Sequence, residues 1–332
     1  MEIKEAILQS EKQEVIDFLS SFDLKYRQDV TYTVYATENG KIIGTVSLLG
    51  SVIMLLAVDK KMQGENIALK LVDHAISKLR SDKIFGYRVF TKPEYLMLFI
   101  DMGFKVLVKT DKFVALEGGA SDIEKTVDGL VNKVVMEHGF IDSDTAAIVI
   151  NGNPFTKGHL SLCEHALSKH RKLMLFVLEE DVSEFSFKER FSLAYLATRA
   201  YSERISVLPS TEYIVSKETF PDYFLHGADE QTKSYAEYDA LIFKKYFMPK
   251  LGIVKRYFGS EKTEYMKIYN ETMEKTLNDA VEIVDRFIEG EEEISAKKVR
   301  ALIKEGKIKE ALSLIPTSNT AVMNLIISNK KW

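Results

Sequence analysis

The segment from Ala146 to Glu179 constrains the fold of this chain more strongly than any other. Its two ends, Ala146–Ile150 and Leu173–Leu178, are continuous apolar runs, as expected of parallel strands that are buried on both faces. Between them, apolar residues recur at helical spacing from Leu160 to Leu167, so one face of a helix can pack on the sheet. A strand, a crossover helix and a second strand form a βαβ unit, which is almost always right-handed. The sequence therefore predicts an α/β fold, in which ligands bind at the carboxyl ends of the parallel strands.

The loop that leaves the first of these strands contains residue types that suit phosphate binding. Gly152 permits a sharp turn, Pro154 removes an amide donor and stiffens the loop, and Gly158 allows a close backbone approach at the start of the helix. The amides and the positive dipole end of a helix attract an anion there. Thr156 and His159 add two hydrogen-bond donors. An ordinary turn with a solvent-facing His would give the same pattern, so the loop alone leaves both interpretations open.

A second helix start, near the C-terminus, shows an unusual charge pattern. Ser295 is placed as the N-cap, and Lys297, Lys298 and Arg300 follow in the first turn and a half. The helix dipole disfavours positive charge at this end. A bound polyanion would remove the conflict, although Glu291–Glu293 could instead neutralise the lysines locally.

A loop with a third helix start follows the strand at Leu173–Leu178. The loop Glu180–Phe185 leaves the carboxyl end of that strand and is therefore expected at the ligand-binding edge. The next helix carries Lys188 and Arg190 in its first turn. These cations could reach phosphates, but a solvated face is the favoured interpretation.

Together these motifs resemble the nucleotidylyltransferase superfamily, whose members hold a nucleoside triphosphate between an (H/T)xGH loop and an ISSTxxR-type helix start. The ordered set of motifs resembles, more particularly, the citrate lyase ligase family. The motifs are Asn153–His159 (NPFTKGH), Thr211–Ser216 (TEYIVS), Thr219–Pro221 (TFP), Arg256–Glu261 (RYFGSE) and Ile294–Arg300 (ISAKKVR). The superfamily commonly has an acidic residue just past the fourth strand, and Glu261 occupies that place.

The resemblance implies an ATP-dependent ligase that adenylates acetate and then acetylates a thiol, releasing AMP and pyrophosphate. The thiol would belong to the phosphoribosyl-dephospho-CoA group on the acyl-carrier subunit of citrate lyase. Thr156 and His159 are expected to stabilise charge on the α-phosphate, with Mg²⁺ accompanying ATP. Ser295, Lys298 and Arg300 are expected to hold the β- and γ-phosphates. The expected ATP-binding residues are Asn151, Gly152, Asn153, Pro154, Phe155, Thr156, Gly158, His159, Gly259, Glu261, Ser295, Lys298 and Arg300.

The N-terminal part of the chain predicts an α+β domain. Asn39-Gly40 joins two strand-like runs and is a strong hairpin signal. A further strand at Val52–Val58, a polar loop and an amphipathic helix at Asn66–Arg80 follow, with Leu69 and Val72 among the residues expected to face inward. The order of these elements resembles a GNAT-type acetyltransferase domain. In that family a Q/R-x-x-G-x-G/A loop cradles the pyrophosphate of acetyl-CoA, and the corresponding residues here are Gln63, Gly64, Asn66 and Ala68.

Two features of that loop depart from the family pattern. Asn66 stands where Gly is usual, although Asn tolerates the left-handed backbone better than most residues. Glu65 adds a negative charge next to the expected phosphates. The favoured interpretation is therefore a domain that holds the CoA-like arm of a substrate, without acetyl transfer of its own.

Composition changes at Glu117–Ser121, and this break separates the two halves of the chain. We expect a GNAT-like domain at residues 1–118, a linker helix at 119–144 and a Rossmann-like adenylating domain at 145–332. A length of 332 residues fits two domains.

Charge and hydropathy exclude several classes of function. The net charge of −4 gives no general attraction for nucleic acid or for an anionic membrane. The longest apolar run, Val52–Val58, is too short to span a bilayer, and the N-terminal residues lack a signal-peptide pattern. The single cysteine, Cys163, lies on the apolar helix face and is expected in the core. A cytoplasmic enzyme is therefore expected.

Three other interpretations stay open. A nucleotidylyltransferase of the phosphopantetheine adenylyltransferase type would have no need of residues 1–118. A GNAT acetyltransferase that uses acetyl-CoA would require a decayed nucleotide-binding domain. A non-catalytic sensor of CoA or nucleotide would not depend on His159.

Overall fold

The computed structural model describes residues 1–332 except 181–182, 217–219, 261–262, 286, 290–291 and 331. The chain forms two compact units. The first unit comprises Met1–Ile123 with Pro221–Ser234, and the second comprises Glu124–Phe220 with Tyr235–Trp332. Residues 221–234, which fall within the expected adenylating domain at 145–332, belong to the first unit in the structure. Among the described residues, no helix is long and apolar enough to cross a membrane.

The first unit contains a seven-stranded sheet in the order β1-β2-β3-β4-β5-β7-β6. Its strands are β1 (Glu2–Glu5), β2 (Tyr32–Glu38), β3 (Lys41–Leu49), β4 (Val52–Val58), β5 (Gly86–Thr91), β6 (Lys105–Lys109) and β7 (Val114–Gly119). Asn39 and Gly40 both have positive φ, at 51° and 74°, which confirms the predicted tight hairpin between β2 and β3. β4 and β5 are parallel but pair only at Val52–Arg88 and Ile53–Val89. Past this short register, Leu55 adopts a φ of 54° at an irregularity of β4.

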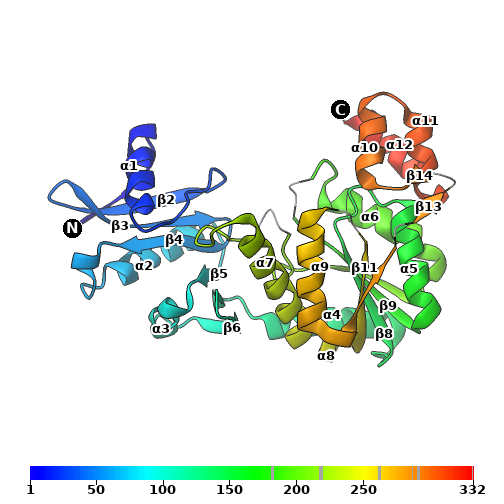
Figure 1. Ribbon diagram of the computed structural model, residues 1–332, viewed down its shortest axis with the longest axis horizontal. Coiled ribbons are helices and arrows are strands. Elements are labelled where there is room, and N and C mark those ends of the chain that lie inside the picture. The colour runs from blue at the N-terminus through cyan, green and yellow to red at the C-terminus, as the bar shows by residue number, and fades with distance from the viewer. Residues whose placement is uncertain (181–182, 217–219, 261–262, 286, 290–291, 331) are drawn as a thin grey trace. The chain divides into compact units, whose positions relative to one another are not determined.

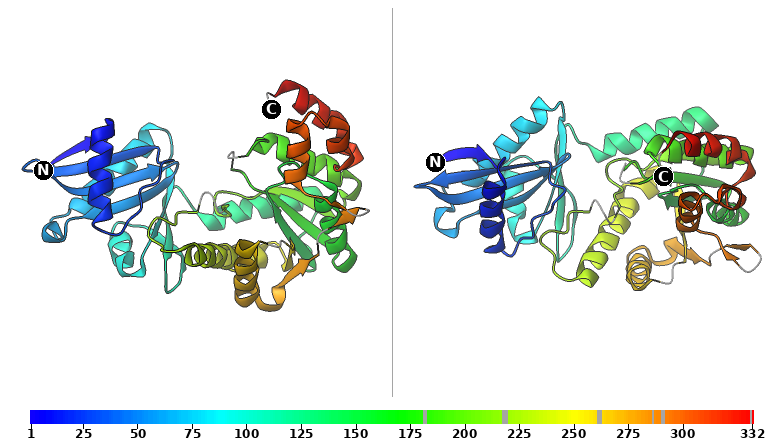
Figure 2. Two further views of the ribbon diagram at one scale, coloured as in Figure 1. Left: turned by 45° about the horizontal axis from the view of Figure 1, so that its top comes forward. Right: turned by 90° about the horizontal axis from the view of Figure 1, so that it is seen from above.

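Helices cover both faces of this sheet, with α1 (Gln9–Ser20) on one face and α2 (Ile67–Ser81) on the other (Figures 1 and 2). A short helix, α3 (Leu96–Asp101), and the 3₁₀ turns Lys60–Met62 and Pro93–Tyr95 complete the unit. The prediction that Leu69 faces inward is wrong, because Leu69 is 40% exposed whereas Leu71 is fully buried. The apolar face of α2 is therefore centred on Leu71, Val72, Ala75 and Leu79.

The second unit contains a five-stranded parallel sheet in the order β10-β9-β8-β11-β12, which confirms the predicted Rossmann-like architecture (Figure 1). The strands are β8 (Thr145–Ile150), β9 (Lys172–Val177), β10 (Ile205–Pro209), β11 (Ile253–Gly259) and β12 (Val281–Val284). A separate ribbon pairs β13 (Ile288–Glu289) with β14 (Glu292–Glu293). Strand order reverses between β8 and β11, since β9 follows on one side of β8 and β11 lies on the other. The carboxyl ends of these two strands are therefore the expected ligand-binding crevice.

In the part of the chain that the structure describes, the second unit has more helices than the first. Its helices are α4 (Ile123–His138), α5 (Lys157–Lys169), α6 (Phe187–Thr198), α7 (Ala228–Ile242), α8 (Met248–Lys250), α9 (Glu264–Leu277), α10 (Ala296–Lys304), α11 (Ile308–Ser313) and α12 (Thr320–Asn329), with α4 and α7 beginning in residues of the first unit. A π-helical stretch, Phe243–Phe247, continues α7, and 3₁₀ turns occur at Arg199–Tyr201, Asn278–Ala280 and Thr317–Asn319. The segment Phe220–Leu225 forms no helix and contains a turn at Tyr223 and Phe224.

One apolar core joins the sheet of the second unit to its C-terminal helices. Val299 and Ile303 of α10 and Met323 of α12 pack in the same cluster as β8, β9 and α5. Cys163 of α5 is fully buried in this cluster, as predicted, and burial raises the pKa of its thiol. Packing of α10 on this core fixes its N-terminus at the carboxyl edge of the sheet.

Candidate functional site

A cavity of about 580 Å³ lies at the carboxyl ends of β8 and β11, and both predicted anion-binding motifs line it. The loop after β8 contributes one wall, and the start of α10 contributes another. Of the expected ATP-binding residues, those that line the cavity are Asn151, Gly152, Asn153, Thr156, Gly158, His159, Gly259, Ser295 and Arg300. Two segments that lie more than 130 residues apart in sequence therefore meet at one site.

At Gly158 the backbone of the first motif comes close to that of the second. A Cβ atom at Gly158 would lie 3.3 Å from the carbonyl oxygen of Ile294, the residue just before the N-cap of α10. The absence of a side chain therefore lets the first turn of α5 contact the backbone of the second motif. Gly152 has a different role, because its φ of 63° falls in the left-handed region that favours glycine.

Thr156 and His159 are locked together at the start of α5. The Nδ1 atom of His159 lies 2.9 Å from the backbone nitrogen of Thr156 and 2.9 Å from its Oγ1. A backbone N–H can only donate, so Nδ1 is an acceptor and the proton of a neutral His159 ring resides on Nε2. The imidazole is thus held in the tautomer that offers a donor on its far side.

Ser295 is the N-cap of α10, as predicted, and its Oγ accepts a hydrogen bond from the backbone nitrogen of Lys298 at 3.2 Å. Lys297 lines the cavity, whereas Lys298, the lysine expected to bind phosphate, is not among the lining residues. The difference arises because consecutive helical residues point about 100° apart. The neutralising role considered for Glu291–Glu293 falls partly outside the described residues.

Arg300 connects α10 to the loop after β8. Its guanidinium donates to the carbonyl oxygen of Asn153 at 2.6 Å and forms an ion pair with Glu184, with Nε 3.2 Å from Oε2. The Asn153 side chain donates to the same Glu184 oxygen at 3.0 Å, and its Oδ1 accepts from the backbone nitrogen of Phe185. This Asn153–Glu184–Arg300 network joins the loop after β8, the loop after β9 and helix α10.

The sequence predicts the Glu180–Phe185 loop at this edge but does not single out Glu184. Lys304 also approaches Glu184, at 3.3 Å. Burial alone would raise the pKa of Glu184, but the hydrogen bond from Asn153 and the charge of Arg300 outweigh it and lower the pKa to about 2. A carboxylate in the loop opposite a cation-rich helix start was the signal that could have identified this residue.

The remaining expected residues lie elsewhere. Phe155 is fully buried in the core cluster, and its ring centroid lies 5.3 Å from that of His159, so it packs against the imidazole. Pro154 is joined to Asn153 by a cis peptide bond and is not among the residues that line the cavity. Glu261 lies outside the described residues.

The interpretation of Arg190 as a solvated or phosphate-reaching cation is wrong. Arg190 is fully buried, and its guanidinium donates to the backbone carbonyls of Asn151, Leu178 and Phe185 at 2.9, 2.7 and 3.0 Å, as well as to that of Glu180. Five N–H donors in a planar fork suit this task, since carbonyls at strand ends otherwise lack partners. Arg190 therefore fixes the chain where the loops after β8 and β9 begin. Its neighbour Lys188 is exposed, as predicted.

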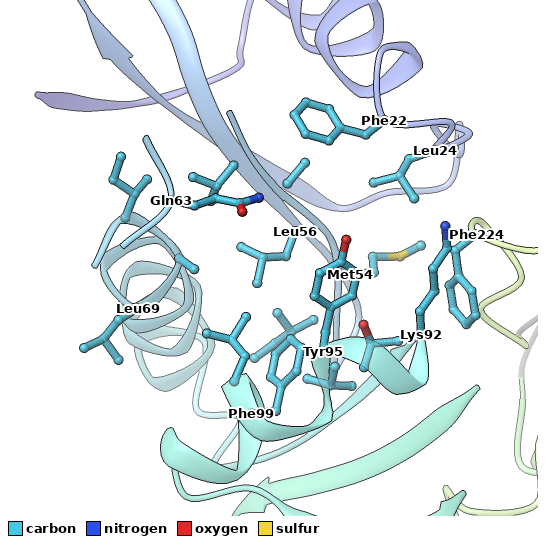
Figure 3. Close-up of a pocket in the computed structure, with 18 of the residues that line it drawn as sticks. Phe22, Leu24, Met54, Leu56, Gln63, Leu69, Lys92, Tyr95, Phe99 and Phe224 are labelled. Carbon is cyan, nitrogen blue, oxygen red and sulfur yellow. The ribbon is translucent and has the colours of Figure 1, made fainter. Parts of the chain in front are cut away.

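The first unit has a cavity of its own, with a volume of about 410 Å³ (Figure 3). Gln63, Gly64, Asn66 and Ala68, the four residues expected to contact a CoA-like arm, all line it. Gly64 and Asn66 have φ angles of 95° and 58°, so Asn66 does adopt the left-handed conformation that the loop requires. Among the described lining residues there is no Asp, Glu, His or Cys.

These observations define a two-unit protein class. An α+β unit with a mainly apolar cavity is followed by a parallel-sheet unit whose cavity is lined by two helix N-termini. Residues 7–115 match the family model described as acetyltransferase (GNAT) domain, and residues 145–323 match that described as citrate lyase ligase C-terminal domain.

Two curated relatives agree with the citrate lyase ligase match. The chain is 33% identical to a citrate (pro-3S)-lyase ligase of Haemophilus influenzae over 79% of this chain and 78% of that protein. It is 30% identical to the Escherichia coli protein of the same name, over 91% and 87%. An acetyltransferase of the GNAT family from Staphylococcus aureus is a solved structure that covers 36% of this chain and 99% of its own, with 19% identity and a TM-score of 0.31. The chain belongs to the citrate lyase ligase family and is a ligase.

Proposed function

We propose that this ligase uses ATP to adenylate acetate and transfers the acetyl group to the thiol of the phosphoribosyl-dephospho-CoA group on the acyl-carrier subunit of citrate lyase. The observation that carries the proposal is the single cavity lined by both the Thr156–His159 and the Ser295–Arg300 helix starts. Amides and cations at two helix N-termini suit a triphosphate better than any neutral ligand. Because the reaction consumes ATP, we propose that the protein works in the cytoplasm.

In the first step, an acetate oxygen attacks the α-phosphorus and the bond to the β-phosphate bridging oxygen breaks, releasing pyrophosphate. Such a reaction depends on positioning and charge neutralisation more than on covalent help from the protein. Because Nδ1 is the acceptor, Nε2 carries the ring proton and would donate to an α-phosphate oxygen, while Thr156 holds the ring. Ser295 and Arg300 would hold the β- and γ-phosphates, and the cavity lining favours Lys297 over Lys298 as the third contact.

Mg²⁺ would enter with ATP as part of the substrate. Across the residues that the structure describes, there is no group of three or more His, Cys, Asp or Glu side chains arranged to hold a metal ion. Mg²⁺ that accompanies a nucleotide is usually bound mainly by phosphate oxygens and water.

In the second step, the thiol sulfur attacks the acetyl carbonyl carbon, the thiol loses its proton, and AMP leaves. We propose that the cavity of the first unit holds the CoA-like arm that carries this thiol. The positive-φ backbone at Gly64 and Asn66 supports a phosphate-cradling loop.

The experiment combines the protein with ATP, acetate and deacetylated citrate lyase and measures AMP. Release of AMP that requires acetate is the expected result. His159→Ala should lower the rate by about 10²–10³-fold, as for removal of one transition-state donor. His165→Ala is the matched control, because His165 lies on the same helix and pairs with Glu282 at 2.9 Å, outside the cavity lining.

Other outcomes identify the competing interpretations. Adenylylation of phosphopantetheine without any acetate requirement would indicate the nucleotidylyltransferase alternative. Acetyl transfer from acetyl-CoA in the absence of ATP would indicate the acetyltransferase alternative. Full activity of the His159→Ala variant would refute the assigned role of the imidazole.

A further inference from the structure

One wall of the cavity in the first unit comes from a distant part of the sequence. Tyr223 and Phe224 line it together with residues of the first 100 positions, although more than 120 residues separate them from that region. They are 7% and 3% exposed. Among the five motifs that suggested the family, none includes either residue, so sequence comparison of motifs did not point to them.

The segment that carries these two residues is an integral part of the first unit. The Tyr223 hydroxyl donates to the carbonyl oxygen of Phe90 at 2.8 Å, and the Tyr223 carbonyl accepts from the backbone nitrogen of Lys25 at 3.1 Å. Asp222 forms an ion pair with Arg27 at 3.4 Å. A buried hydroxyl with a fixed partner, a backbone hydrogen bond and an adjacent ion pair hold this wall of the cavity in place.

The positions of Gln63 and Phe224 along the cavity indicate which part of a bound ligand this wall contacts. Figure 3 shows Gln63 near one end and Phe224 at the other, with Leu56 and Met54 between them. A ligand whose phosphates rest on the Gln63–Ala68 loop would extend over apolar side chains toward Phe224. A phosphopantetheine arm has this form, because its phosphate end is anionic and its other end carries the thiol.

We propose that Tyr223 and Phe224 are specificity-determining residues that pack against the thiol-bearing end of a CoA-like arm. This inference rests on the proposed binding of that arm by the first unit. The segment follows directly, in sequence, the stretch Thr211–Phe220 of the second unit. A short segment that lies in sequence between two stretches of the second unit therefore supplies the selectivity of the thiol pocket in the first unit.

The test is a calorimetric titration of the full-length protein with dephospho-CoA, in the presence of saturating α,β-methylene-ATP so that the nucleotide cavity is filled. Phe224→Ala should weaken binding by about tenfold, since it removes most of one aromatic contact surface. It should also raise the affinity for butyryl-dephospho-CoA relative to acetyl-dephospho-CoA, because the shortened side chain leaves room for a longer acyl group. Phe85→Ala, at an exposed position of the same unit, should change neither value.

The titrations distinguish failure of the proposed arm binding from failure of the inference about Phe224. If the wild-type protein does not bind dephospho-CoA, the proposed role of the first unit fails. If Gln63→Ala weakens binding while Phe224→Ala changes neither affinity nor acyl preference, the CoA-like arm is bound but the inference about Phe224 is refuted. Phe224→Leu, which keeps the site apolar, replaces Phe224→Ala if thermal unfolding shows that the alanine variant does not fold, and a shift of twofold or more in the same direction is then expected.

Discussion

Replacing Gly158 with alanine tests whether the two anion-binding motifs must be in backbone contact. The new Cβ would lie 3.3 Å from the Ile294 carbonyl oxygen and 3.5 Å from Thr156 Oγ1, so the neighbouring backbone must yield by a few tenths of an ångström. Alanine is favoured over glycine within a helix by at most about 1 kcal/mol. The gain and the contact strain oppose each other, so the free energy of unfolding should change by less than about 1 kcal/mol.

Activity should respond more than stability does. A misplacement of about 1 Å in an active site can cost on the order of 10²-fold. If the loss scales with displacement, a shift of a few tenths of an ångström between α5 and α10 predicts a fall of about three- to tenfold in kcat/KM for ATP. The assay is acetate-dependent AMP formation at varied ATP, with chemical denaturation run on the same samples.

Gly129→Ala is the matched control. Gly129 lies in the interior of α4, at an exposed position where an added Cβ would meet nothing within 4 Å. This variant should gain about 0.5–1 kcal/mol in stability and keep wild-type kcat/KM. If Gly158→Ala also retained wild-type kcat/KM, the close approach of the two motifs would have no bearing on catalysis, and the argument would be refuted.

Two further predictions concern stability. Glu184→Gln should be less stable than the wild type at pH 7. The difference should vanish as the pH falls from the carboxyl's ordinary 4.5 toward its folded pKa of about 2, because a lowered pKa stabilises only while the group is ionised. Urea denaturation at pH 7, 4.5 and 3 measures this, and a difference that stays constant over the series would contradict it. Gly252→Ala should lower the free energy of unfolding by about 2–4 kcal/mol, because φ is 62° and the new Cβ would meet the Asp142 carbonyl oxygen at 2.1 Å. Gly227→Ala, where φ is 83° and the space around the residue is open, should lower it by only about 1 kcal/mol. Equal losses in these two glycine variants would show that steric contact does not decide the effect.

Much of the fold was predictable from short-range pattern. The apolar runs around β8 and β9 gave a parallel βαβ unit, and Asn39-Gly40 gave the hairpin between β2 and β3. Such features depend on residues within about one element of each other, where periodicity and turn chemistry act directly. Leu69 shows the limit of this reasoning, because an apolar residue one position away from the buried face has the same hydropathy as one on it.

Side-chain partners across the fold were much harder to predict. Arg190 could be recognised as a cation near a helix start, but its burial depends on carbonyls supplied by three loops and strand ends. The same holds for the pairing of Arg300 with Glu184, which lie 116 residues apart. A single sequence read for local pattern carries no information on which distant groups will meet.

The sequence by itself determined the types of group at the candidate site: a glycine-containing loop after a buried strand, a Thr–His pair, and an N-capped helix rich in cations. It determined them because each is a local arrangement of backbone freedom, hydrogen-bond donors and charge. Only the tertiary structure decided that Gly158 touches Ile294, that Lys297 and not Lys298 faces the cavity, and that Tyr223 and Phe224 complete a pocket in the first unit. Those outcomes depend on how the elements of each unit pack on its apolar core, and packing is a property of the whole unit that no short stretch contains.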